Sequence, residues 1–251
     1  MSKNETNAPI SPVLFLSHGG GPMPLLGDAS HHQLIQFTLE ITTTFVKPDA
    51  ILVISAHWEE AQPTITSGAL PALIYDYSGF PKEAYAIQYP VAGAPALASK
   101  IFNLLKIAGI DAKLDDQRGF DHGVFVPLKL MYLQADIPCV QLSLVNSLQP
   151  QQHIQIGKAL ASLRKDNVLI IGSGFTFHNM RAFFAPATDE SQAMNTSFEQ
   201  WLIDTCFSKQ YTEAEREQKL IHWDSAQPQD TATLEKNTYC PCWFAMAQLV
   251  Q

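Results

Sequence analysis

The segment ILVISAHWEE, residues 51–60, begins with four consecutive aliphatic side chains. An apolar run without polar alternation is typical of a strand that is buried on both faces, as strands of parallel sheets are. The run ends at Ser55, and His57 follows two residues later. Because ligands in open α/β sheets collect outside the carboxyl ends of the strands, His57 lies where a functional site is expected.

Other short apolar runs also predict strands, and helical spacing fills most of the intervals between them. The predicted strands are residues 13–17, 139–144 and 168–171, with shorter ones at 86–89 and 112–114. The predicted helices are residues 28–45, 94–108, 126–134, 150–163, 191–207, 213–220 and 243–250. This alternation predicts one α/β domain over residues 13–251, preceded by a flexible N-terminus at residues 1–12.

The composition favours a folded protein with small-molecule rather than polyanionic partners. Of the 251 residues, 46% are hydrophobic and 16% are charged, and the net charge is −8. A negative chain is poorly suited to nucleic acid or to an anionic membrane surface, since both attract Lys and Arg. The N-terminal MSKNETNAPISP lacks the apolar core of a signal peptide, and the four cysteines form no CxxC pair. We therefore expect a cytoplasmic protein, whose oligomeric state the composition leaves open.

The eight histidines fall into two groups by their surroundings. His18, His57 and His178 lie at or just after the ends of apolar runs, and His122 lies in a turn-like segment between Asp121 and Gly123. Strand ends at one edge of a sheet are neighbours, so two of these histidines could bind a first-row metal ion and the others could transfer protons. We interpret the remaining four as surface or internally hydrogen-bonded histidines: His31, His32, His153 and His222.

Four motifs, in order along the chain, resemble those of the class III extradiol aromatic ring-opening dioxygenases. They are SHGGGP (residues 17–22), ISAHWE (54–59), GFDHG (119–123) and GSGFTFHNM (172–180). The nearest branch acts on catechols similar to 4,5-dihydroxyphenylalanine (4,5-DOPA). The resemblance implies a central mixed, largely parallel sheet flanked by helices. It also implies that O₂ opens the ring of a small aromatic diol to give a muconic semialdehyde.

The same resemblance implies roles for the four histidines of the motifs. His18 and His57 match the histidines that bind non-haem Fe(II), or zinc in many preparations. His178 matches the acid/base, and His122 matches a residue that contacts substrate and oxygen.

The C-terminal segment departs from the family pattern. Members of this branch carry a segment like HPxxEHLLP, whose first histidine is the third metal ligand, and Thr233 and Thr238 stand at its two histidine positions here. A threonine hydroxyl is a poor ligand beside imidazole or carboxylate. Glu235, His222 or a water molecule could fill the position instead.

Two other functions remain compatible with the residues. Two strand-end histidines also suit a zinc-dependent hydrolase, because zinc with open positions activates water. The threonines at 233 and 238 suit a non-catalytic relative that binds metal weakly. Finally, the aromatic side chains of residues 63–95 could form the wall of a pocket for an aromatic ligand.

Overall fold

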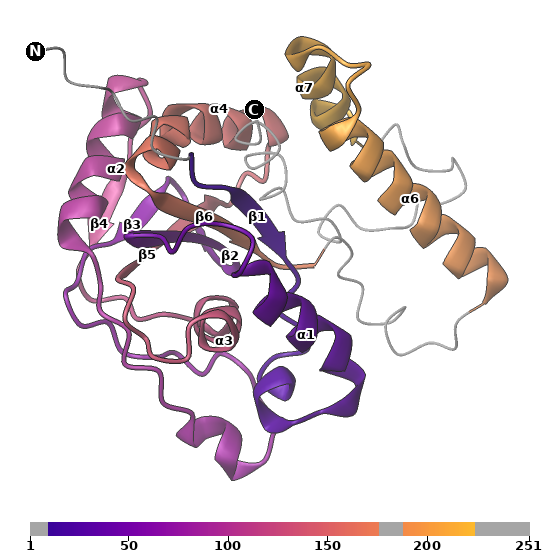
Figure 1. Ribbon diagram of the computed structural model, residues 1–251. Helices are drawn as coiled ribbons and strands as arrows, with labels where there is room; N and C mark the ends of the chain where they lie inside the picture. Colours follow the sequence, from indigo (N-terminus) through magenta and orange to yellow (C-terminus); the bar gives the residue numbers. More distant parts are fainter. Residues whose placement is uncertain (1–9, 176–187, 224–251) are drawn as a thin grey trace, which may run out of the picture.

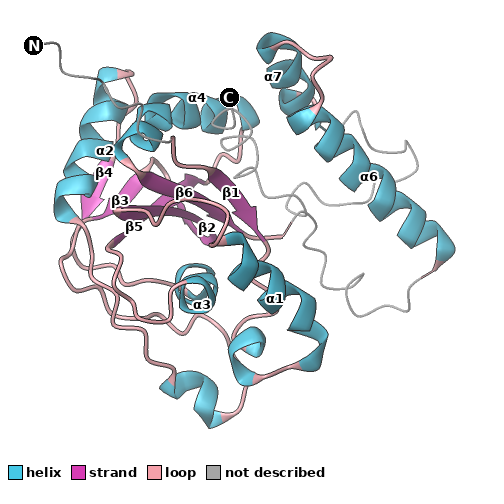
Figure 2. Ribbon diagram, in the orientation of Figure 1, coloured by secondary structure: helices cyan, strands magenta, loops and turns pink. Residues whose placement is uncertain are grey.

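The computed structural model describes residues 10–175 and 188–223, and a six-stranded sheet lies at its centre (Figures 1 and 2). The strand order is β1-β6-β2-β5-β3-β4. All neighbouring strands are parallel except β3 and β5, so the predicted mixed, largely parallel sheet is confirmed. The strands are β1 (Val13–Leu16), β2 (Ala50–Glu60), β3 (Thr64–Thr66), β4 (Lys113–Asp115), β5 (Cys139–Val145) and β6 (Val168–Ser173).

Strand β2 is buried on both faces, as its aliphatic run predicts. Leu52 and Ile54 pack in one core cluster with residues of α2 (Pro95–Ile107) and α4 (Pro150–Leu160). Ile51 and Val53 point to the opposite face and pack with residues of α3 (His122–Met131). Figure 1 shows α2 and α4 on one side of the sheet and α3 and α1 (His32–Ile41) on the other. Burying each such side chain contributes about 1.5–3 kcal/mol, so these two layers hold the strand ends in place.

Two helices follow at the far end of the described chain, α6 (Asp189–Phe207) and α7 (Glu213–Ile221). Both begin with a capping box, at Thr188 and Thr212. Leu220 of α7 packs against Ile154 of α4. The helix predicted for residues 243–250 lies outside the described residues.

The predicted strand at residues 86–89 is wrong. The structure has a 3-10 helix at Lys82–Ala86 there, followed by non-repetitive chain. The aromatic and aliphatic side chains that suggested a strand are used to anchor a loop. Tyr89, which is 4% exposed, donates its hydroxyl proton to the backbone carbonyls of Leu128 and Tyr132.

The helix predicted to open at Pro127 begins five residues earlier, at His122. Pro127 lies inside the helix, where it cannot donate a backbone hydrogen bond to residue 123. The first backbone N–H of the helix, that of His122, donates to the side chain of Asp76. A carboxylate distant in sequence therefore satisfies the start of this helix, which local sequence patterns do not reveal.

Helix α1 also begins differently from the prediction. Asp28 caps a 3-10 turn, Ala29–His31, and α1 continues from it to Ile41 rather than to residue 45. Likewise α4 ends at Leu160 and a 3-10 helix, Ala161–Asp166, follows it.

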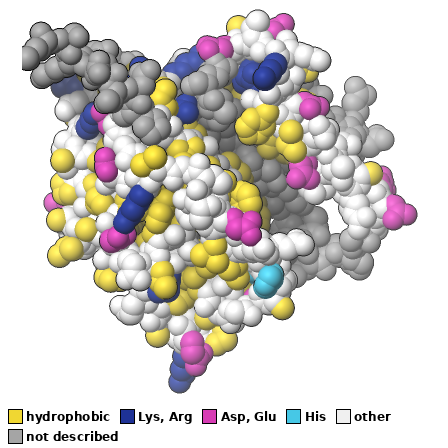
Figure 3. Space-filling model, in the orientation of Figure 1, with side chains coloured by type: hydrophobic (Ala, Val, Ile, Leu, Met, Phe, Trp, Pro, Cys, Tyr) yellow, Lys and Arg dark blue, Asp and Glu magenta, His cyan; other side chains and the backbone are white. Residues whose placement is uncertain are grey.

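None of the described helices is both long and apolar enough to cross a bilayer. On the face of the molecule in Figure 3, Lys and Arg side chains are scattered singly or in small groups among acidic and hydrophobic ones.

His153 is buried rather than on the polar side of its helix, and it is hydrogen-bonded at both ring nitrogens. Its Nε2 accepts from the backbone N–H of Val145 at 3.1 Å, and its Nδ1 donates to the carbonyl of Gln149 at 2.9 Å. Only the neutral imidazole with a proton on Nδ1 satisfies both bonds. Burial lowers the pKa of His153, although the bond to Gln149 opposes this in part.

We predict that His153 makes the protein less stable in mild acid. Because its folded-state pKa lies below its unfolded value of about 6.5, the unfolded chain binds the proton more strongly. The free energy of unfolding, measured in urea between pH 7.5 and 5.5, should therefore fall as the pH drops below about 6.5. His153→Asn should flatten this dependence, whereas the exposed His32→Asn should not. Equal slopes for the three proteins would contradict the prediction.

Candidate metal centre

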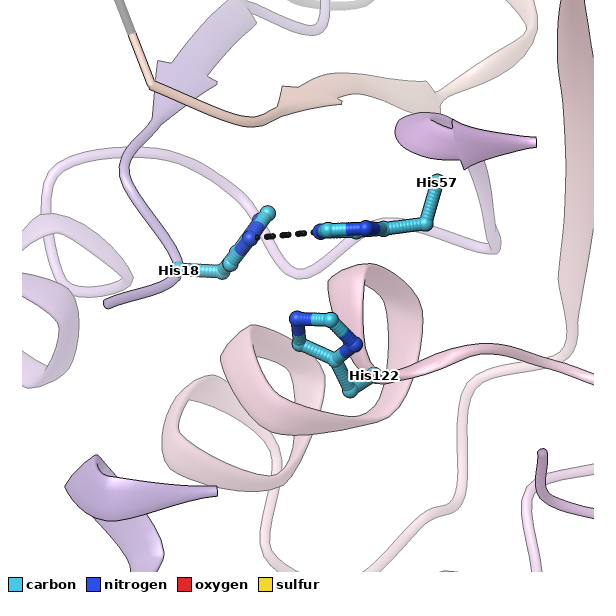
Figure 4. Close-up of side chains that lie close together, drawn as sticks. All are labelled: His18, His57 and His122. Atoms are coloured by element: carbon cyan, nitrogen blue, oxygen red, sulfur yellow. Dashed lines mark hydrogen bonds between the residues drawn. The ribbon is translucent and has the colours of Figure 1, made fainter. Parts of the chain in front are cut away.

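Three histidines from separate elements meet at the carboxyl edge of the sheet. His18 lies two residues after β1, His57 lies near the end of β2, and His122 is the first residue of α3. One ligand nitrogen from each can be chosen so that all lie within 4.8 Å of one another. The Nε2 atoms of His18 and His57 are 2.9 Å apart (Figure 4). The structure thus brings together three of the four histidines singled out from the sequence.

The sheet explains why His18 and His57 meet. Strand β6 lies between β1 and β2 and is parallel to both, so the ends of β1 and β2 are one strand apart. The register of β2 against β5 shifts between Ile54 and Glu59, and His57 lies within this irregular stretch. Such irregularities bend a strand and redirect its side chains.

The central strand also supports the His18 ring directly. Ser173, the last residue of β6, places its Oγ 2.9 Å from Nδ1 of His18. His18 is 3% exposed and Ser173 is fully buried. With Nδ1 held by the serine, the ring presents Nε2 to His57.

The glycine run after His18 packs on His31. A Cβ at Gly19, whose φ is +77°, would lie 2.6 Å from the His31 ring. The backbone N–H of Gly20 donates to Nε2 of His31 at 3.1 Å, and Nδ1 of His31 lies 2.8 Å from Asp28. His31 therefore is internally hydrogen-bonded, as predicted, but it also shapes the loop that carries His18.

Asp76 holds His122 and was missed by the sequence analysis. Its Oδ1 accepts from Nδ1 of His122 at 2.8 Å and from the backbone N–H of the same residue at 3.0 Å. Its Oδ2 lies 3.8 Å from Nδ1 of His57. Burial alone would raise the pKa of Asp76, but the hydrogen bonds and charge of His122, with a smaller effect of His57, outweigh it and lower the pKa to about 2.

A buried polar network lies behind His57. Ser55 accepts from the backbone N–H of His57 and donates to Oδ1 of Asp121 at 2.7 Å. Asp121 is fully buried, and Gln141 and Arg118 donate to its other oxygen. Asp121 and His122 thus have different partners, as expected for neighbours in sequence that point apart.

Aromatic rings of the loop between β3 and α2 lie beside His122. The Tyr77 ring centroid is 5.7 Å from that of His122 and 5.4 Å from that of Phe80. The Tyr77 hydroxyl donates to the carbonyl of Ala84, and burial raises its pKa to about 12. Tyr77 therefore offers the site an apolar ring rather than a proton.

The remaining candidates from the sequence are not part of this cluster. His178, Thr233, Glu235 and Thr238 lie outside the described residues. His222 follows α7, which packs on α4 rather than on α3, and it is not among the three clustered histidines.

The donor set fits a divalent first-row metal ion. Figure 4 shows the ring nitrogen of His122 that faces away from its backbone pointing toward the His18–His57 pair. The Nε2 atoms of His18 and His57 are hydrogen-bonded to each other at 2.9 Å. A metal ion bound by both nitrogens at about 2.1 Å would replace this hydrogen bond with only a small change in their separation.

Comparison with known proteins gives a consistent result. The sequence pattern of the family described as the catalytic LigB subunit of aromatic ring-opening dioxygenase matches residues 11–249. A 4,5-DOPA dioxygenase extradiol of Beta vulgaris is 38% identical over 221 residues, which are 87% of this chain and 82% of that protein. A dioxygenase of Hapsidospora irregularis is 46% identical over 189 residues, 72% of this chain but only 58% of the relative's length.

A solved structure is similar as well. The crystal structure of an uncharacterized protein from Escherichia coli K12 superposes with a TM-score of 0.74 at 29% sequence identity. The superposition covers 95% of this chain and 88% of the other.

We predict that Gly123→Ala destabilises the protein, although alanine is the better helix former. A Cβ at Gly123 would lie 2.3 Å from Oγ of Ser55 and 3.2 Å from the His57 ring. Relieving such an overlap costs about 1–3 kcal/mol, and the fully buried Ser55 at 2.3 Å puts this site at the upper end of the range. The cost should therefore exceed the roughly 1 kcal/mol that alanine gains in a helix. Gly20→Ala is the matched control, because its Cβ meets nothing closer than Met23 Sδ at 3.4 Å. Urea unfolding in which Gly123→Ala is as stable as wild type would contradict the prediction.

Proposed function

Because the chain belongs to the LigB family of aromatic ring-opening dioxygenases, we propose that it is an Fe(II)-dependent extradiol dioxygenase. Its substrates would be O₂ and a small catechol similar to DOPA, and its product a muconic semialdehyde. The observation that carries this proposal is the cluster of His18, His57 and His122 at the carboxyl edge of the sheet. We further propose that residues 13–251 form the catalytic domain and that it acts in the cytoplasm.

His18 and His57 would hold the metal through their Nε2 atoms. Ser173 stabilises the orientation of His18, and the backbone contact with Ser55 helps to fix His57. Bound Fe(II) would supply open coordination positions for both catechol oxygens and O₂, and zinc could replace it in purified protein.

His122 would contact the substrate and oxygen. Its ring faces the pair of metal ligands, and Tyr77 packs against it at the edge where an aromatic substrate would lie. Catechol must lose protons to chelate a metal ion, and a neutral imidazole near it can accept one. We assign the acid/base role to His178, which lies outside the described residues.

The third protein ligand distinguishes this chain from the family pattern. Thr233 stands where that pattern has a histidine, and its hydroxyl is a weak ligand. His122 brings a nitrogen to within 4.8 Å of the other two. His122 could therefore bind the ion itself, a role that the family pattern gives to the C-terminal histidine.

We predict that protein loaded anaerobically with Fe(II) consumes O₂ when mixed with catechols and forms a yellow ring-opened product. His57→Ala should lose both the stoichiometric metal and the oxygen uptake, because it removes a ligand at the strand end. Losing a ligand should weaken metal binding by more than the roughly 10–100-fold typical of losing a supporting group. His32→Ala, at an exposed position, is the control.

Stoichiometric metal without oxygen uptake over a broad catechol panel would refute the dioxygenase assignment. Absence of metal from wild-type protein after reconstitution would instead favour a non-catalytic relative.

The role of His122 is tested by His122→Gln. If His122 contacts substrate, the variant should keep near wild-type metal content and lose turnover, since His18 and His57 remain. Metal content by elemental analysis and oxygen uptake are measured on the same samples. Loss of metal equal to that of His57→Ala would overturn the substrate role and make His122 the third ligand.

A further inference from the structure

One carboxylate faces two of the clustered histidines. Asp76 lies in the irregular chain between β3 and α2, and its side chain is 23% exposed. Its Oδ1 accepts both the backbone and the ring N–H of His122, and its Oδ2 is 3.8 Å from His57. Among the described residues, the cluster with metal-ligand spacing consists of the three histidines and does not include Asp76.

We propose that Asp76 is a positioning residue that sets the tautomer and direction of His122. The inference rests on the proposed function, because it concerns how the same histidine cluster meets a metal ion and substrate. Asp76 is 46 positions away from His122 in sequence.

The chemistry of the contact determines where the imidazole proton lies. An ionised carboxylate only accepts hydrogen bonds, so at 2.8 Å Nδ1 of His122 must carry the proton. A neutral imidazole has one N–H, which leaves Nε2 with a free lone pair. That nitrogen is the one directed at His18 and His57 (Figure 4). The lone pair is what His122 needs either to accept a substrate proton or to bind a metal ion.

The backbone bond fixes the position of the ring as well as its tautomer. The same Oδ1 accepts the first N–H of α3 at 3.0 Å, where the positive end of the helix dipole favours a negative charge. Two bonds from one residue to one oxygen restrict the His122 backbone and its χ angles together.

Asp76 also connects the loop between β3 and α2, which carries the aromatic rings, to the cluster of three histidines. Its neighbours Tyr75 and Tyr77 donate their hydroxyl protons to the carbonyls of Ile87 and Ala84 within the same loop. The loop is thus stabilised internally. Asp76 links it to the first residue of α3, and Tyr89 links it to Leu128 near the end of the same helix. Movement of the aromatic rings and of His122 should therefore be coupled through this carboxylate.

The test compares Asp76→Asn and Asp76→Ala with wild type, using Asp136→Ala as the control. Asn keeps an acceptor oxygen but loses the charge, whereas Ala removes both bonds to His122. Asp136 is an exposed carboxylate paired with Lys47 at the surface. For each protein, ¹⁵N NMR reports the His122 tautomer without metal, and oxygen uptake of the Fe(II)-loaded protein with catechols reports turnover. Zinc titration reports the metal affinity, and urea unfolding reports the stability.

Wild type, Asp76→Asn and the control should show His122 with the proton on Nδ1. Asp76→Ala should shift the proton toward Nε2. Oxygen uptake with catechols should fall about 10–100-fold in Asp76→Ala and by less in Asp76→Asn, as expected when a group that orients a working side chain is lost, whereas zinc affinity should stay near wild type because His18 and His57 remain. The control should bind zinc like wild type.

The proposal is overturned if folded Asp76→Ala keeps the wild-type tautomer and oxygen uptake. If Asp76→Ala does not fold, Asp76→Asn decides, and wild-type oxygen uptake in that variant overturns the proposal. If wild type binds no metal, the proposed function fails, while a tautomer shift in Asp76→Ala still supports the role of Asp76.

Discussion

The close approach of helix α3 to the end of strand β2 is the constraint on which the candidate site depends. Gly123 fits where a Cβ would lie 2.3 Å from Ser55, and this contact places His122 next to His57. The sheet supplies the other half of the site, because β6 holds the ends of β1 and β2 one strand apart. Packing of apolar layers on both faces of β2 makes these positions rigid.

The carboxylates of the site lie behind the histidines rather than among them. Asp76 faces the Nδ1 side of His122, and Asp121 is joined through Ser55 to the backbone of His57. Both carboxylates leave the Nε2 atoms of the histidines to face one point. This differs from a site with two histidines and one carboxylate, in which the carboxylate itself binds the ion. Among the described residues, the donors at that point are three nitrogens.

Much of this arrangement could be predicted from the sequence, for identifiable reasons. Aliphatic runs ending in His18 and His57 reveal the strands and the edge of the sheet at once. The role of Asp76 and the contact of His31 with Gly20 could not be found this way, because the partners are 46 and 11 positions apart. The start of α3 was missed for the same reason, since Asp76 satisfies its first N–H. Residues 86–89 were misread because the apolar side chains there anchor a loop and form no strand.

The central claim is that His18 and His57 hold a metal ion. Its most direct test is a crystal structure of metal-loaded protein, with anomalous diffraction recorded at the X-ray absorption edge of the metal. We predict an anomalous peak about 2.0–2.2 Å from Nε2 of both His18 and His57. We also predict that the His122 ring faces this peak while Asp76 remains bonded to Nδ1. A peak elsewhere, or none between His18 and His57 at full metal loading, would contradict the claim.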